Sequence, residues 1–323
     1  MSDEVTQLSN PFSTGGGGPH FENQVQAAFV VLMLTGGVVP CLRPWPIKKV
    51  KLQGKYEGYN TDDFIVFVED RNGDQKAKLL AQIKHSVGIT ENDPNFSKVI
   101  QAAWNDFQNP EIFDQRTDVI ALITGPLSAY DIENARVILE RARHSENAQE
   151  FFKKVDLANF SSNDQRDKLK AFRSQLKNAN KGADVGDEQL WMFLKSFHLL
   201  GYDFDVTSGV TLSLLNSHIA QFDCDDISGL WAKVANYVAS SNHNAGTITH
   251  DTISDEIKDA FAKRISVAQI PEKLLKKRKV SERKSVFPAG DKGNALMYAN
   301  LLGSWIDKSD GDMDAIQKLI ERK

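Results

Sequence analysis

Two short stretches decide the fold of this chain, DDFIVFV at residues 62–68 and AQIKH at residues 81–85. In the first, two carboxylates precede an unbroken apolar run, which predicts a central strand. In the second, Gln82 and Lys84 stand two residues apart, so along a strand they point to the same face, roughly 6.5 Å apart. The turn sequence RNGD at residues 71–74 predicts a hairpin between the two strands. We therefore expect the amide and the amine beside the start of the aspartate strand.

The elements around this hairpin predict an α/β fold. The chain order is expected to be helix, three strands, helix and strand, or αβββαβ. A crossover helix between two strands implies a mixed sheet flanked by helices. The apolar spacing places the helices at 21–35 and 96–108 and the strands at 50–54, 63–69, 78–86 and 117–124.

The chain is predicted to have three parts. Residues 1–18 form a flexible glycine-rich arm, 19–150 the α/β core, and 151–323 a mostly α-helical region. From about residue 128 onward, helices are expected almost without interruption, at 128–145, 147–157, 163–179, 187–200, 210–221, 227–241, 250–264, 291–306 and 311–322.

Composition narrows the class of protein. The 323 residues carry a net charge of −4 and are 41% hydrophobic, as in a soluble globular protein without a general nucleic-acid signature. Cys41 and Cys224 are too few for a disulfide framework, so the expected location of the protein is the reducing cytoplasm. The apolar run at residues 27–34 is too short to span a membrane, which takes about 20 residues. No P-loop is present, which argues against an ATPase role for this chain.

The four polar residues of the expected cluster suit phosphodiester hydrolysis with Mg²⁺ or Mn²⁺. Magnesium prefers hard oxygen ligands and one or two carboxylates. Asp63 and Glu22, the acid of the first helix, would supply these, and Gln82 could add a carbonyl oxygen. Lys84 would orient the attacking water and offset the charge that develops on the phosphate. Asp62 is the alternative ligand, because Asp62 and Asp63 point to opposite faces if both lie in the strand.

A second group of residues is a candidate DNA contact. The stretch 38–58 is the most basic of the first hundred residues. Two interpretations stay open, a solvated strand face and a surface that contacts phosphates. The residues that would make this contact are Lys48, Lys49, Lys51 and Lys55, with His85 beside the cluster.

The residues quoted above resemble those of a known family. Phe21-Glu22 at a helix start, then DDFIV at 62–66, then Gln82-Ile83-Lys84, are similar to the PD-(D/E)xK nuclease superfamily in its Q-x-K form. The phrase GGGGPHFENQVQAAF at residues 15–29 resembles the opening of the Mrr-like double-stranded-DNA endonuclease domains of bacterial antiphage effectors. Such effectors include CBASS nucleases and Avs-type STAND NTPases. The resemblance covers about residues 15–125.

The resemblance implies a restriction-endonuclease-like core and a metal-dependent endonuclease that cuts duplex DNA in antiphage defence. It assigns the three motif roles to Asp63, Gln82 and Lys84, with Glu22 as the preceding helix acid. Gln82 departs from the family, which usually has an acid there. The family also implies a homo-oligomer, because two sites must meet to cut both strands, and a sensor or NTPase module that follows the helical region or associates with it. A catalytically inactive fold that binds DNA or a partner is the alternative.

Overall fold

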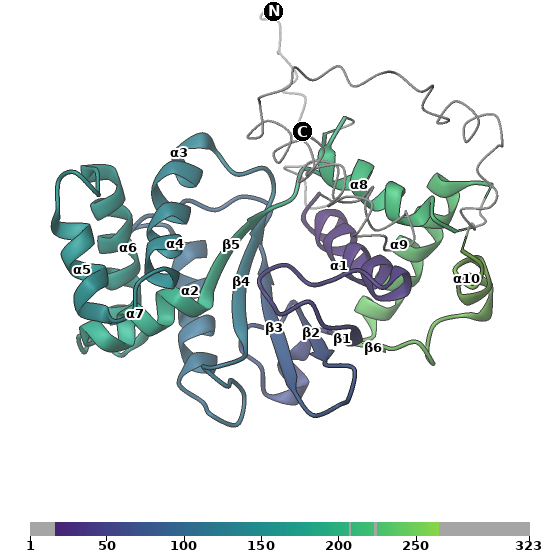
Figure 1. The fold of residues 1–323 in the computed structure, drawn as a ribbon, viewed down its shortest axis with the longest axis horizontal. Coiled ribbons are helices and arrows are strands. Elements are labelled where there is room, and N and C mark those ends of the chain that lie inside the picture. Colours follow the sequence, from purple (N-terminus) through teal and green to yellow (C-terminus); the bar gives the residue numbers. More distant parts are fainter. Residues whose placement is uncertain (1–16, 207, 223–224, 265–323) are drawn as a thin grey trace, which may run out of the picture. The chain divides into compact units, whose positions relative to one another are not determined.

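A single mixed sheet lies between two helical layers (Figure 1). The computed structural model describes residues 17–206, 208–222 and 225–264. The chain divides into two units, 1–265 and 266–323, and the described residues belong to the first. Cys224, most of the expected arm and the helices expected at 291–306 and 311–322 lie outside the described residues.

The six strands run in the order β5-β4-β3-β2-β1-β6. β3 pairs antiparallel with β2 and parallel with β4, so the aspartate strand and the Gln-x-Lys strand are neighbours at the centre of the sheet. β5 adds a further parallel strand, and β6 pairs antiparallel with β1. The strands are β1 (Ile47–Leu52), β2 (Phe64–Glu69), β3 (Lys76–Ile83), β4 (Val119–Thr124), β5 (Phe197–Gly201) and β6 (Thr247–Ile248).

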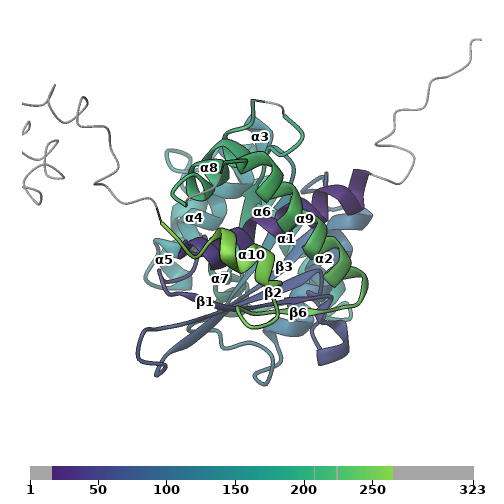
Figure 2. The ribbon, with the colours of Figure 1, turned by 90° about the vertical axis from the view of Figure 1, so that its right-hand side faces the viewer.

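Alternation along β2 divides the apolar core between the two faces. Phe64, Val66 and Val68 join one buried cluster, and Ile65 joins the other, as the two-residue period of a strand requires. The first cluster is covered by α1 (Gly17–Thr35), α8 (Val210–Ile219), α9 (Ile227–His243) and α10 (Asp255–Ala260). Figure 2 shows this layer from its outer side, with α9 and α10 in front of the strands.

The opposite face is covered by the other helices. Fully buried rings from several of them, among them Phe96, Phe151 and Phe172, fill the space above Ile65 and Leu80. The helices of this layer are α2 (Pro94–Phe107), α4 (Val137–Arg143), α5 (Ala148–Asp156), α6 (Asn163–Ala179) and α7 (Asp187–Ser196). A short helix, α3 (Ala129–Asp131), and a π-helical turn, η2 (Ile132–Arg136), lead into α4. A 3-10 helix, η1 (Gly54–Glu57), follows β1.

The structure confirms the mixed α/β fold and corrects several boundaries. α1 begins at Gly17, inside the arm expected at 1–18, and the strand expected at 50–54 is β1, which ends at Leu52. The helix expected at 187–200 ends at Ser196, and the chain continues directly as β5, which pairs with β4. The stretch after residue 151 is therefore not purely helical, since it supplies β5 and β6 at the two edges of the sheet. Within the described part of the chain, no helix is both long and apolar enough to cross a membrane.

Gly54 provides a test of how tightly the turn after β1 packs. A Cβ added there would lie 2.1 Å from Cδ1 of Ile65, which is fully buried and cannot swing aside. We expect Gly54→Ala to lower the free energy of unfolding by about 1–3 kcal/mol, as overpacking does, measured by urea denaturation. Gly18→Ala is the control, because nothing lies within 4 Å of its Cβ position and no loss is expected. Equal stability of the two variants would contradict this packing.

Candidate active site

Asp63 lies at the point where β2 begins, beside the end of β3. The pairing of β2 with β3 ends at Phe64 opposite Ala81, so the next position sets Asp63 opposite Gln82. Asp63 Oδ2 accepts a hydrogen bond of 2.5 Å from the Ile83 amide. The Lys84 ammonium lies 3.6 Å from the same oxygen. The pairing of two neighbouring strands thus brings the carboxylate to the Gln-x-Lys segment.

Gln82 and Lys84 complete this group. Gln82 is buried, and its side chain lies close enough to the Asp63 carboxylate to lower the pKa of that group. The Lys84 ammonium also donates to the Ile83 carbonyl oxygen at 2.8 Å, while its side chain remains 31% exposed. The structure therefore brings together the three motif residues that the sequence predicts, with the lysine open to solvent from one side.

Glu22 reaches the site from α1, on the other side of the strand end. Its Oε1 accepts three amide hydrogen bonds, from Gln26 at 3.1 Å, Gln53 at 2.9 Å and Asn242 at 3.0 Å. Gln26 also donates to the Asp63 carbonyl oxygen at 3.1 Å, which ties α1 to the aspartate strand. Glu22 is thus held in one orientation by amides from three different elements.

Sequence reasoning missed Gln53 and Asn242 as members of this site. Asn242 lies in α9, and its side chain also accepts from Gln53 at 3.1 Å. Gln53 adopts a left-handed backbone (φ 50°) directly after β1, which turns its side chain out of the strand pattern. Neither residue belongs to a motif, and only the fold reveals their proximity to Glu22.

Asp106 of α2 anchors the loop that carries the aspartate pair. Its fully buried carboxylate accepts from the Asn60 amide at 2.9 Å, the Thr61 amide at 2.6 Å and the Asn60 side chain at 2.8 Å. These donors come just before Asp62 and Asp63. The start of β2 is therefore fixed from the helix layer opposite α1.

Burial and neighbouring charges perturb both aspartates. Burial raises the pKa of the Asp63 carboxyl, the Lys84 ammonium and the Ile83 hydrogen bond lower it, and the Glu22 charge raises it again, with a net upward shift. The pKa of Asp62 is also raised, by burial and then by the charge of Asp63. The Ile83 amide donates to Asp63, and the Lys84 ammonium lies 3.6 Å from the same oxygen. This arrangement favours Asp63 over Asp62 as the motif aspartate.

The oxygen atoms at this point suit one cation. The Lys84 ammonium is held by the Asp63 carboxylate and the Ile83 carbonyl, both hard oxygen donors of the kind that Mg²⁺ binds. Glu22 lies close enough for its charge to raise the Asp63 pKa, and a cation would relieve that repulsion. Among the described residues, no three His, Cys, Asp or Glu side chains form a metal cluster. Asp63 and Glu22 are thus the two carboxylates at this place that could hold a metal ion.

The candidate DNA-contacting residues do not share one environment. Lys48 and Lys55 are exposed, whereas the Lys49 ammonium lies over the Phe67 ring at 3.9 Å. Lys51 is buried, pairs with Glu57 at 3.1 Å and donates to the Ala245 carbonyl. His85 contacts Asp205 at 2.6 Å. Lys48 and Lys55 are therefore the best placed of the five to contact a phosphate.

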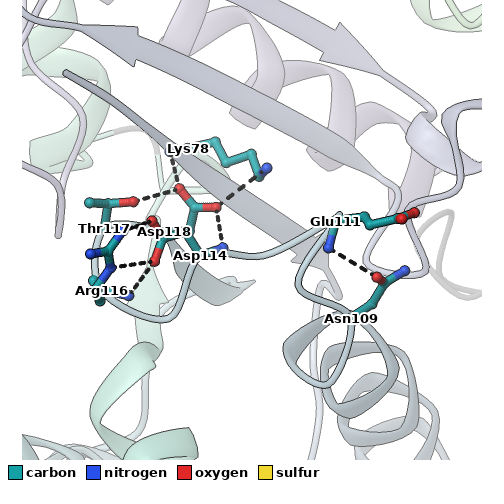
Figure 3. Close-up of polar contacts among 7 residues, drawn as sticks. All are labelled: Lys78, Asn109, Glu111, Asp114, Arg116, Thr117 and Asp118. Atoms are coloured by element: carbon teal, nitrogen blue, oxygen red, sulfur yellow. Dashed lines mark hydrogen bonds and ion pairs between the residues drawn. The ribbon is translucent and has the colours of Figure 1, made fainter. Parts of the chain in front are cut away.

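A second cluster of charged residues, around Asp118, has a structural explanation (Figure 3). Asp118, just before β4, accepts from the backbone amides of Lys78 at 3.0 Å and Asp114 at 2.9 Å. The Lys78 ammonium pairs with it at 3.3 Å. Burial raises the pKa of Asp118, and these bonds offset part of the shift. This aspartate–lysine pair joins β3 to the loop before β4 and provides a natural control for the Asp63–Lys84 pair.

Comparison with known proteins does not assign the chain to a family. No protein-family model matches it. No curated protein matches it either. Among solved structures, it is similar to the Acinetobacter baumannii Cap4 SAVED/CARF-domain containing receptor with the cyclic trinucleotide 3'3'3'-cAAA, at 10% identity and a TM-score of 0.40. The match covers 76% of this chain and 46% of that chain, so this chain spans less than half of the receptor's length. A TM-score this low carries no functional argument.

The electrostatics of the site can be tested directly. Glu22→Gln removes a negative charge and is expected to lower the Asp63 pKa, whereas Lys84→Ala removes a positive charge and is expected to raise it. Carboxyl-carbon NMR titration of aspartate-labelled protein measures both shifts. Lys78→Ala is the control, since its ammonium pairs with Asp118, and it is expected to leave the Asp63 pKa unchanged. A raised Asp63 pKa in Glu22→Gln, or a lowered Asp63 pKa in Lys84→Ala, would contradict the geometry.

Proposed function

We propose that this chain is a metal-dependent endonuclease that hydrolyses phosphodiester bonds of double-stranded DNA, as the effector part of a bacterial antiphage defence protein. The observation that carries the proposal is the meeting of Asp63, Gln82 and Lys84 at one strand end, with Glu22 reaching the same place from α1. The defence setting rests on the sequence resemblance alone.

The proposed chemistry assigns a task to each residue. The bound cation would activate water and neutralise charge on the phosphoryl group. Asp63 and Glu22 would hold it, with Gln82 as a neutral oxygen donor. The Lys84 ammonium, partly exposed beside Asp63, would orient the attacking water and offset the negative charge of the phosphate. The amides of Gln53 and Asn242 would keep Glu22 in position.

The chain order supports a restriction-endonuclease-like core. The first six main elements run α1, β1, β2, β3, α2, β4, which matches the expected αβββαβ order. The proposed roles also use this order, since the helix acid, the strand aspartate and the Gln-x-Lys segment follow one another along it. Cutting both strands of a duplex would need two such sites, so we propose a homo-oligomer, regulated by a fused or associated sensor or NTPase module.

A non-catalytic binding module is the second candidate. Two observations favour it, the neutral Gln82 in the place of a family acid and the lack of a three-residue acidic cluster among the residues described. The two candidates differ in metal binding. Calorimetric titration with Mg²⁺ and Mn²⁺ that gives no heat, while duplex DNA still binds, would favour the binding module over the nuclease.

Cleavage of plasmid DNA with Mg²⁺ tests the nuclease. Lys84→Ala is expected to reduce the rate by about 10²- to 10³-fold, the usual cost of removing one group that stabilises the charge of the transition state. The matched control is Lys78→Ala, which removes a lysine of β3 from a similar aspartate pair without touching the site. It is expected to cleave at the wild-type rate.

Two outcomes would overturn this proposal. One is cleavage by Lys84→Ala at the wild-type rate, which would trace the activity to another source. The other is an inactive wild type that also shows no divalent-metal heat, because a nuclease awaiting its activating signal should still bind its cation. Circular dichroism of each variant excludes misfolding as the cause of any loss.

A further inference from the structure

A polar pocket adjoins the site on the side of Glu22. It has a volume of about 630 Å³, within the usual range of ligand pockets, about 300–1,000 Å³. Its walls come from β1 and the turn that follows it, and from the end of α9 with the residues after that helix. The lining residues are Lys51, Gln53, Tyr56, Asn242, His243, Asn244 and Ala245.

Two side chains connect this pocket to the proposed active site. Gln53 and Asn242 line the pocket and also donate hydrogen bonds to Oε1 of Glu22, at 2.9 and 3.0 Å. A ligand in the pocket would therefore be separated from a metal-binding carboxylate by a single layer of amides.

The pocket wall has the chemistry of a nucleotide site. Tyr56 is 88% exposed, so most of its ring is available for contact. The other walls are hydrogen-bonding groups, with the Lys51 ammonium fixed between Glu57 and the Ala245 carbonyl. The Asn244 amide group donates back to the Ser240 carbonyl at 2.9 Å, which orients its side chain. An aromatic face beside fixed amides suits a stacked base and its hydrogen-bonding edge.

An exposed ring can stack only on a base whose own face is free. In a paired duplex each base is already stacked on both sides, and taking one out costs a few kcal/mol, least where the base is unpaired. A single-stranded or unpaired nucleotide can therefore occupy the pocket at the lowest cost. The need for a base with a free face therefore separates DNA with an unpaired nucleotide from fully paired duplex DNA as substrates of the proposed nuclease.

Resting on the proposed nuclease function, we infer that this pocket binds one unpaired nucleotide beside the scissile phosphate, with its base stacked on Tyr56. The favoured substrates are then DNA duplexes with an unpaired nucleotide, such as a flap, a gap or a frayed end. Fully matched duplex DNA is bound more weakly, because it must first release a base.

Binding measured without cleavage tests the inference. The full chain in EDTA is titrated, by fluorescence anisotropy, into a matched duplex and into the same duplex with one unpaired nucleotide. Wild type is expected to prefer the second. Tyr56→Ala is expected to weaken binding of that DNA by about 5- to 150-fold, the value of stacking one base, and to lose most of the preference. Tyr56→Phe keeps the ring and should retain both affinity and preference.

Phe160→Ala is the matched control, because Phe160 is a half-exposed aromatic residue outside the pocket lining. It should bind both DNAs like the wild type. The inference is overturned if Tyr56→Ala binds the unpaired DNA as tightly as the wild type, if Tyr56→Phe loses as much as Tyr56→Ala, or if the wild type prefers neither DNA. The outcome of this binding test is independent of the cleavage assay. A preference for unpaired DNA that depends on Tyr56 would support nucleotide binding in the pocket even if the protein cleaved no DNA.

Discussion

The hydrogen bond from the Ile83 amide to the Asp63 carboxylate is the interaction on which the candidate site depends. It forms because β2 and β3 pair in one register, with Phe64 opposite Ala81. A shift of one residue would turn Asp63 to the other face of the sheet and away from Lys84. The alternating burial of β2 makes such a shift costly, since it would move Phe64 and Val66 out of their core. The hydrophobic pattern thus fixes the position of the polar site.

The site combines this rigid strand pair with helices from both layers. Asp106 of α2 holds the loop before Asp62 on one side. Gln26 of α1 and Asn242 of α9 hold Glu22 on the other side. The result is a half-buried carboxylate whose pKa is raised despite an adjacent lysine. Perturbed pKa values of this kind are common at functional sites, where burial and neighbouring charges shift them.

Local sequence signals predicted the central hairpin, both main helices of the core and the meeting of Asp63, Gln82 and Lys84, because each depends on a short periodic pattern. These local signals failed where contacts between residues distant in the sequence determine the structure. Residues 197–201 continue an apolar run from α7, and only the free edge of β4 makes them a strand. Asn242 lies 220 positions from Glu22, a separation at which no spacing argument operates. Gln53 reaches the site because its backbone is left-handed, a conformation that a glutamine in the sequence does not indicate.

We propose that Asp63, together with Glu22, holds one divalent cation next to Lys84. The most direct measurement is a crystal structure of the protein grown with Mn²⁺, with data collected at the manganese absorption edge. We predict one anomalous peak in contact with the Asp63 and Glu22 carboxylates, and the loss of that peak in Asp63→Asn. A manganese peak elsewhere, or an unchanged peak in Asp63→Asn, would contradict the account.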